Sequence, residues 1–337
     1  MILYDFEYER ADSLQDAAEI LARLGGGARV MGGGTDLVPN MRIEIVRPTT
    51  VIGLKDIKAQ PLSVTPEGGV RIDALTTLAA LTRSDLILSK FPMVAESARV
   101  VGSNQVREMG TLAGNLCQDS RCLQLNQKHD YQFKAPCYKR GGKCCYPFPN
   151  NRHGRCWSVY MSDVAPALIA LNAQLETISA DGGRRLPVEN MFTGDGMHPI
   201  GLEPTEIISA VVTPPLPSNF GWDYYKSSRR GGFEFGIAVI AITLSLNSDR
   251  KTCSTARIVI GAVRERPIRA IKAEQAFVGQ SIDDKLIATT ASAAIDEVNP
   301  LPHHGFTRSF IIDNARVYLR RALTRAVERA REPSPGA

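Results

Sequence analysis

The chain has 337 residues, of which 44% are hydrophobic and 22% are charged, and its formal net charge is +5. This length predicts two or three globular domains, and the small, dispersed charge argues against a nucleic-acid-binding protein. The N-terminal segment contains acidic residues and no secretory apolar core, and no apolar run reaches the ~20 residues of a membrane helix. We therefore expect a cytoplasmic protein that binds neither membranes nor nucleic acid.

The first part of the sequence alternates helical and extended patterns. Ser13 is placed to cap a helix, and three glycines at 25–27 stop it. A short apolar strand then leads directly into Gly32, Gly33 and Gly34. The expected elements are a helix over 13–24, strands over 28–31, 51–54 and 70–74, and helices after Thr76 or Thr77 and over 93–101.

Regular patterns return after residue 162 and continue to the C-terminus. Prolines at 214, 215 and 217 indicate a linker, because proline continues neither a helix nor a central strand. The last helix is rich in arginine but has an apolar side, which is typical of a solvated terminal helix. The expected elements are an apolar run over 167–171, strands over 173–178, 238–247 and 256–261, and helices from Ile268, Ile282 and Ile311. This alternation indicates an α/β or α+β protein.

Two glycine-bearing turns are candidates for binding a phosphate-bearing cofactor. The first, at 32–37, follows a strand, and glycines allow backbone N–H groups to face an anion without interference from Cβ. The second lies at 110–115. Neither turn has the G-x-G-x-x-G pattern or the lysine of a P-loop, so a tight turn without a ligand is the alternative for each.

Three ordered motifs resemble those of a known family. They are V-M-G-G-G-T-D-L at 30–37, G-T-L-A-G-N-L at 110–116 and S-D-V-A-P-A-L-I-A-L at 162–171. Together they resemble the FAD-binding medium subunit of the molybdenum hydroxylases, the family of xanthine dehydrogenase and carbon monoxide dehydrogenase. The resemblance extends to Y-K-x-x-R-R at 225–230 and R-P-x-R-A at 266–270 with Glu274, so it covers nearly the whole chain.

The resemblance implies an α+β fold with an FAD-binding domain of the vanillyl-alcohol-oxidase type. This domain would span 1–217, as two α/β subdomains over about 1–55 and 56–217. A C-terminal α+β domain of the carbon monoxide dehydrogenase flavoprotein type would span 218–330, followed by a tail over 331–337. The implied FAD contacts are Val30, Met31, Gly32, Gly33, Gly34, Thr35, Asp36 and Leu37 at the pyrophosphate, Thr111, Gly114 and Asn115, and Asp163 and Lys226 near the flavin ring.

Six of the seven cysteines lie between Cys117 and Cys156, where about forty residues separate two motifs that the family joins closely. We interpret the segment at about 120–160 as an insertion. In a reducing compartment such thiols hold a metal or perform redox chemistry more often than they form disulfides. Zinc sites favour C-x₂₋₄-C pairs, which only Cys117 and Cys122 provide, so a [4Fe–4S] cluster is preferred over zinc or unligated thiols.

The insertion resembles that of the β subunits of 4-hydroxybenzoyl-CoA reductases, through N-L-C-Q-D-S-R-C at 115–122 and C-Y-K-R-G-G at 137–142. This resemblance makes Cys117 a bystander. Cys144 is the alternative to Cys145, and Cys253, expected in a turn before a strand, is inert. Loop histidines are expected at His129 and His153. The implied ligands are Cys122, Cys137, Cys145 and Cys156, covered by Tyr131, Phe133, Tyr138, Tyr146, Phe148 and Trp157.

The function implied by these resemblances is electron transfer, with no catalytic residue on this chain. A large molybdenum-cofactor subunit and a small subunit with two [2Fe–2S] clusters would complete a doubled heterotrimer. Electrons from ferredoxin would pass through [4Fe–4S] and FAD toward molybdenum, where 4-hydroxybenzoyl-CoA is reduced to benzoyl-CoA in aromatic degradation. The alternatives are the FAD subunit of a related hydroxylase that oxidises an N-heterocycle or aldehyde, and a stand-alone zinc- or FAD-binding module.

Overall fold

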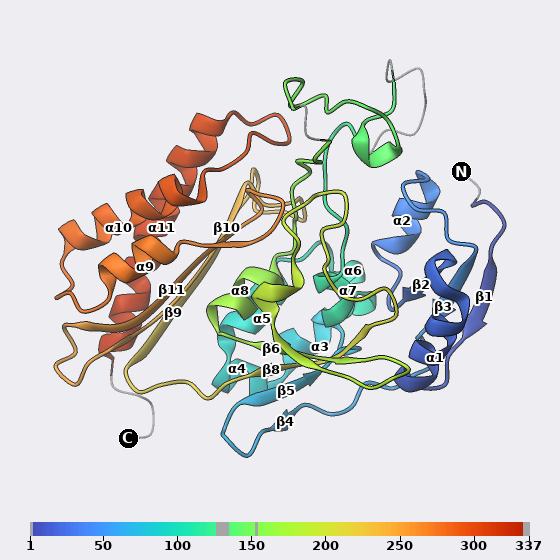
Figure 1. Cartoon of the computed structure of the whole chain (residues 1–337). Coiled ribbons are helices and arrows are strands. Elements are labelled where there is room, and N and C mark those ends of the chain that lie inside the picture. Colours follow the sequence, from blue (N-terminus) through green and yellow to red (C-terminus); the bar gives the residue numbers. More distant parts are fainter. Residues whose placement is uncertain (1–2, 126–134, 152–153, 333–337) are drawn as a thin grey trace.

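A computed structural model describes residues 3–125, 135–151 and 154–332 of the chain. Three sheets, each with its own helices, follow one another along the sequence (Figure 1). His129, Tyr131, Phe133, His153 and the end of the tail lie outside the described residues. Within the described part of the chain, no helix is long and apolar enough to cross a bilayer.

The first sheet is parallel, with strand order β1-β3-β2, and forms the blue part of Figure 1. The hydroxyl of Ser13 accepts a hydrogen bond from the amide of Asp16 at the start of α1, as the sequence predicts. Buried alanines on α1 pack with Ile52 of β3. The elements are β1 (Glu7–Arg10), α1 (Leu14–Leu24), β2 (Ala28–Met31), α2 (Leu37–Arg42) and β3 (Thr50–Gly53).

The second sheet has the order β4-β5-β8-β6-β7 and is antiparallel, with the helices that follow β5 packed beside it. Thr77 caps α3, because its hydroxyl accepts from the amide of Ala80, so Thr76 is free for another role. The elements are β4 (Ser63–Val64), β5 (Val70–Asp73), α3 (Leu78–Arg83), α4 (Asp85–Lys90), α5 (Pro92–Arg99), α6 (Asn104–Met109), α7 (Leu112–Leu116), α8 (Val164–Ala170), β6 (Gln174–Ile178), β7 (Arg185–Pro187) and β8 (Ile207–Thr213).

The cysteine-rich segment leaves this second unit after α7 and returns before α8. Arg121 and Val159 exchange two backbone hydrogen bonds of 2.7 and 2.9 Å, so the outgoing and returning chains are paired at its base. The segment rises above the sheets as the green loops at the top of Figure 1, and its described residues include the short 3₁₀ helix η3 (Tyr138–Arg140).

The third sheet is antiparallel, with order β12-β11-β10-β9, and three helices cover one of its faces (Figure 1). The helix expected from Ile268 begins three residues later, because Ile268 and Arg269 pair with β11 as β12. Cys253 is the buried first residue of β11, so the turn expected there is wrong. The elements are β9 (Phe220–Ser227), β10 (Ala238–Leu246), β11 (Cys253–Gly261), β12 (Ile268–Arg269), α9 (Ile271–Phe277), α10 (Asp284–Val298) and α11 (Arg308–Arg331).

Glu274 and the arginine-rich last helix both have structural roles in this third unit. Glu274 on α9 accepts a hydrogen bond from the amide of Ile258 and pairs with Arg269, so it joins the helix to the sheet. On α11 most apolar side chains, including Leu319 and Leu323, are buried, whereas Val317 is exposed, and Arg329 packs over Trp222. The arginine-rich helix is therefore part of the core of this unit and is stabilised through its apolar side.

Candidate cofactor and cysteine site

The loop between β2 and α2 contacts the second glycine turn directly. A Cβ at Gly33 would lie 1.7 Å from the carbonyl oxygen of Met109, and one at Gly32 would lie 3.0 Å from the hydroxyl of Thr111. Gly34 has a φ of +69°, which favours glycine. The sequence motifs at 30–37 and 110–116, about eighty residues apart, are thus brought together in space.

The amides of this loop are available to an anion. Within the described residues, Gly33, Gly34 and Thr35 donate their backbone N–H groups to no protein acceptor; the two glycines are half-buried and Thr35 is exposed. Successive unpaired N–H groups on a glycine-rich turn form an anion-binding concavity. The residues therefore fit the pyrophosphate of a dinucleotide cofactor.

Asp36 is held by the protein itself. Its Oδ2 accepts hydrogen bonds of 3.0 Å from the amide of Asp119 and from the side chain of Asn40, and Arg121 pairs with its Oδ1. Asp36 lies at the end of the glycine loop, while Asp119 and Arg121 lie at the base of the cysteine-rich segment. The carboxylate therefore ties these two segments together.

Thr111 and Asn115 form the second part of the candidate cofactor site. The hydroxyl of Thr111 accepts from the amide of Gly114 and caps α7, and the side-chain oxygen of Asn115 accepts a 2.6 Å hydrogen bond from Ser162. The motif that contains Asn115 is thereby attached to the turn that carries Asp163.

Asp163 and Lys226 form a buried ion pair with a distance of 2.8 Å, and Lys226 also donates to the carbonyl of Val100. Burial raises the pKa of Asp163 to about 6, although the Lys226 ammonium acts in the opposite direction. The second carboxylate oxygen, Oδ1, is buried without a partner within the described residues. An unpaired buried oxygen is costly, which indicates that a further group completes this site.

Thr76 is a residue that sequence reasoning missed. Its hydroxyl is also buried without a partner in the described part of the chain, and its carbonyl accepts from the amide of Leu112, the residue after Thr111. The sequence signal was present, since two threonines precede α3 and one cap is sufficient. Thr76 therefore joins the candidate residues around the second turn.

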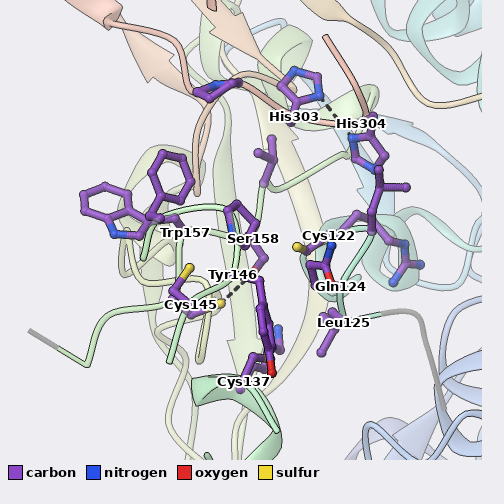
Figure 2. A pocket seen from close by; sticks show the side chains of 18 of the residues that line it. Cys122, Gln124, Leu125, Cys137, Cys145, Tyr146, Trp157, Ser158, His303 and His304 are labelled. Atoms are coloured by element: carbon purple, nitrogen blue, oxygen red, sulfur yellow. Dashed lines mark hydrogen bonds between the residues drawn. The ribbon is translucent and has the colours of Figure 1, made fainter. Parts of the chain in front are cut away.

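The cysteine-rich segment encloses a cavity of about 310 Å³ against the turn at 302–306 of the third unit (Figure 2). Cys122, Cys137, Cys145 and Cys156 all line it, as does Cys144. Cys117 lies outside it, at the C-terminal end of α7. The aromatic residues at the wall are Tyr138, Tyr146, Phe148 and Trp157, together with Phe306.

The sulfur atoms of the cavity affect one another. Burial raises the pKa of the Cys145 thiol, and the nearby Cys156 and Cys122 raise it further. Burial likewise raises the pKa of Cys122, and the neighbouring Cys137 adds to this shift. Cys144 differs, because its sulfur donates to the carbonyl of Pro136 at 3.5 Å. The structure thus places the four predicted ligands around one cavity, together with Cys144, the alternative to Cys145.

Two histidines complete the wall on the side of the third unit (Figure 2). The Nδ1 atoms of His303 and His304 are 3.0 Å apart, and the other ring nitrogen of His303 lies 3.2 Å from the carbonyl of Ile237. Burial lowers the pKa of His303 to about 4, so this ring is neutral at pH 7. Sequence reasoning missed both residues, since nothing in the local pattern relates them to cysteines that lie about 150 to 180 residues earlier in the chain. Within the described residues, no three Cys, His, Asp or Glu side chains are arranged to hold one metal ion.

The comparisons with known proteins agree with this architecture. A family described as the FAD-binding domain in molybdopterin dehydrogenase matches residues 4–216, and the carbon monoxide dehydrogenase flavoprotein C-terminal domain matches residues 223–326. The carbon monoxide dehydrogenase medium chain of Afipia carboxidovorans is 27% identical, covering 98% of this chain and 100% of the relative. The aldehyde oxidoreductase FAD-binding subunit PaoB of Escherichia coli is 29% identical, covering 86% of this chain and 92% of the relative.

A solved structure gives the same result for the fold. Carbon monoxide dehydrogenase from Hydrogenophaga pseudoflava matches with a TM-score of 0.80 and 24% identity, over 98% of this chain and 99% of that chain. The predicted α+β fold, with an FAD-binding domain and a C-terminal domain of the carbon monoxide dehydrogenase flavoprotein type, is therefore confirmed.

Proposed function

Because the chain belongs to the family of FAD-binding subunits of molybdopterin dehydrogenases, we propose that it transfers electrons as the flavin and iron–sulfur subunit of a molybdenum-cofactor enzyme. FAD supplies the redox chemistry when bound, whereas the protein supplies its binding and electrostatics. The relatives are subunits of oxidoreductases, and names such as "medium chain" refer to enzymes of several chains. We therefore propose a large molybdenum-cofactor subunit and a small [2Fe–2S] subunit as partners.

The FAD site that we propose combines the two glycine turns with the Asp163–Lys226 pair. The unpaired amides of Gly33, Gly34 and Thr35 would hold the pyrophosphate. The hydroxyl of Thr111 lies beside Gly32, and the unpartnered hydroxyl of Thr76 belongs to the residue that pairs with Leu112 in the second turn. Lys226 would place a buried positive charge near the ring, where charge accumulates on reduction.

The observation that supports the iron–sulfur part is the cavity that the four predicted ligands line, together with Cys144. A single zinc ion, with sulfur ligands at about 2.3 Å, needs its thiolates nearly in contact. A [4Fe–4S] cluster binds each cysteine through a different iron and fills the space between them. The cysteines line a cavity of about 310 Å³, and no three Cys, His, Asp or Glu side chains within the described residues are placed to hold one metal ion, which supports the cluster over zinc. We propose Cys122, Cys137, Cys145 and Cys156 as its ligands.

The reaction that we propose for the complex is that of 4-hydroxybenzoyl-CoA reductase. The phenolic hydroxyl would leave as water when the ring receives two electrons and two protons, which gives benzoyl-CoA. Ferredoxin is the electron donor that we propose, since an extra low-potential centre suits this direction. This proposal rests on the inserted cysteine segment, which resembles that of these reductases.

A second candidate is a hydroxylase that oxidises an aldehyde or an N-heterocycle. It is favoured by the names of the relatives, which include aldehyde oxidoreductase and nicotine 6-hydroxylase. Purified complex can be assayed with 4-hydroxybenzoyl-CoA and a reduced viologen, and in parallel with aldehydes and N-heterocycles and an oxidised acceptor. We expect benzoyl-CoA to form. Oxidation of the second group of substrates without benzoyl-CoA would instead identify a hydroxylase.

A further inference from the structure

One buried cation faces the cysteine cavity from within the inserted segment. Lys139, on η3, lines the cavity, and its side chain is only 6% exposed. The ammonium has three hydrogens and three acceptors: the carboxylate of Asp119, the hydroxyl of Ser120 at 2.8 Å and the carbonyl of Gly196 at 2.7 Å. The position of this charge is therefore fixed by the scaffold beneath the insertion.

A chain of hydroxyl groups connects Lys139 to one of the cysteines. The hydroxyl of Ser120, which accepts from Lys139, also contacts the hydroxyl of Ser158. The oxygen of Ser158 in turn lies 3.1 Å from the sulfur of Cys156. Since the ammonium can only donate, Ser120 must accept from it. The hydroxyl proton of Ser120 therefore points away from Lys139.

The hydroxyl of Ser158 can donate to Cys156 or to the carbonyl of Gly196, which is 3.2 Å away, and a thiolate at Cys156 is the stronger acceptor because it is charged. A thiolate is an acceptor only, so the hydrogen bond runs from the Ser158 hydroxyl to the sulfur. Ser120 then donates either to Ser158 or to the carbonyl of Gly196, which is 2.9 Å away. The chain thus delivers a hydrogen bond to sulfur as well as positive charge.

The positive charge of Lys139 acts on more than one cysteine. Lys139 lines the same cavity as Cys122 and Cys156, so its positive charge faces more than one of the proposed ligands. Positive charge and hydrogen bonds at cysteine sulfurs are the terms by which a protein sets the potential of a cluster, because the reduced cluster is more negative than the oxidised one.

We propose that Lys139 and Ser158 are positioning residues that make an iron–sulfur cluster in this cavity easier to reduce. The inference rests on the proposed function, which supplies the cluster. Lys139 contributes a fixed positive charge close to two of the four cysteines, and Ser158 contributes the hydrogen bond to Cys156. Neither residue is a proposed ligand, so we expect the cluster to form when either is replaced.

The test is a potentiometric titration of the full chain, purified anaerobically, with dithionite as reductant and the EPR signal of the reduced cluster as readout. Lys139→Met and Ser158→Ala are compared with the wild type and with Lys143→Met, which removes an exposed lysine of the same segment. We expect a more negative midpoint potential for Lys139→Met, a smaller shift in the same direction for Ser158→Ala, and none for Lys143→Met.

The outcomes separate the inference from the function on which it depends. A wild-type chain without iron and acid-labile sulfide would contradict the proposed function. A cluster whose potential is the same in Lys139→Met and in the wild type would overturn the inference alone. If Lys139→Met does not fold or loses its iron, Ser158→Ala decides, and an unchanged potential there overturns the inference.

Discussion

Gly33 illustrates how a single missing side chain shapes the cofactor site. Replacement by alanine would place Cβ 1.7 Å from the Met109 carbonyl, so the two loops must separate. Such overpacking costs about 1–3 kcal/mol, and we expect Gly33→Ala to lower FAD affinity about tenfold or more. Gly26→Ala is the matched control, because nothing lies within 4 Å of its Cβ. FAD content measured by absorbance, with circular dichroism for folding, checks this; equal FAD in both variants would contradict it.

Asp163 makes the stability of the chain depend on pH. Its pKa, raised by burial to about 6, exceeds the value of about 4 of an unfolded aspartate. Between these values the folded chain binds the proton more tightly, so the free energy of unfolding falls as pH rises from about 4 to 6. Two pKa units correspond to up to about 3 kcal/mol.

Asp163→Asn removes this dependence. Urea unfolding of the apo chain and the variant, in parallel at about pH 4.5 and 6.5, measures the difference between them. We expect the stability of the wild type relative to the variant to decrease between the two pH values. A difference that is constant, or that increases, would show that the pKa of Asp163 is not raised.

Single Cys→Ser substitutions distinguish the proposed cluster ligands from the other cysteines. We expect serine at position 122, 137, 145 or 156 to abolish or strongly reduce the iron content, because each replacement removes one thiolate from the cavity. Cys144→Ser and Cys117→Ser are the controls, and both should retain iron and the EPR signal. Loss of the cluster with Cys144→Ser, and its retention with Cys145→Ser, would show that Cys144 is the ligand and Cys145 is not.

At the scale of elements, the inserted segment is closed at its base. The backbone pairing of Arg121 with Val159 holds the two ends together, and the glycine loop lies outside the segment. We expect a chain in which a Gly/Ser hairpin turn replaces residues 123–157 to keep FAD but lose all iron. Loss of both groups, measured by absorbance and metal analysis, would mean that the segment also forms the flavin site.

Sequence reasoning was most successful for elements that local signals define. The helix after Ser13 and the strand before Gly32 have caps, periodicity and glycine stops within a few residues. The start of α9 was misjudged, because Ile268 pairs with β11, a tertiary contact that no local pattern contains. Lys139, His303 and Ser158 were missed for the same reason, since only folding brings them to the cysteines.

At the scale of the whole molecule, the cysteine cavity lies between the inserted segment and the third unit. Its wall combines residues of the insertion with Pro302, His303 and Phe306. Asp36 joins the glycine loop to the base of the same segment through Asp119 and Arg121. The fold therefore places the proposed flavin and cluster sites on one connected scaffold, which suits electron transfer between them.

The most direct measurement is the iron, acid-labile sulfide and FAD content of the anaerobically purified full chain. The account predicts about four iron and four sulfide per FAD, together with an EPR signal after reduction. Zinc in place of iron, or FAD without iron and sulfide, would contradict the central claim that this chain carries an electron-transfer cluster beside its flavin.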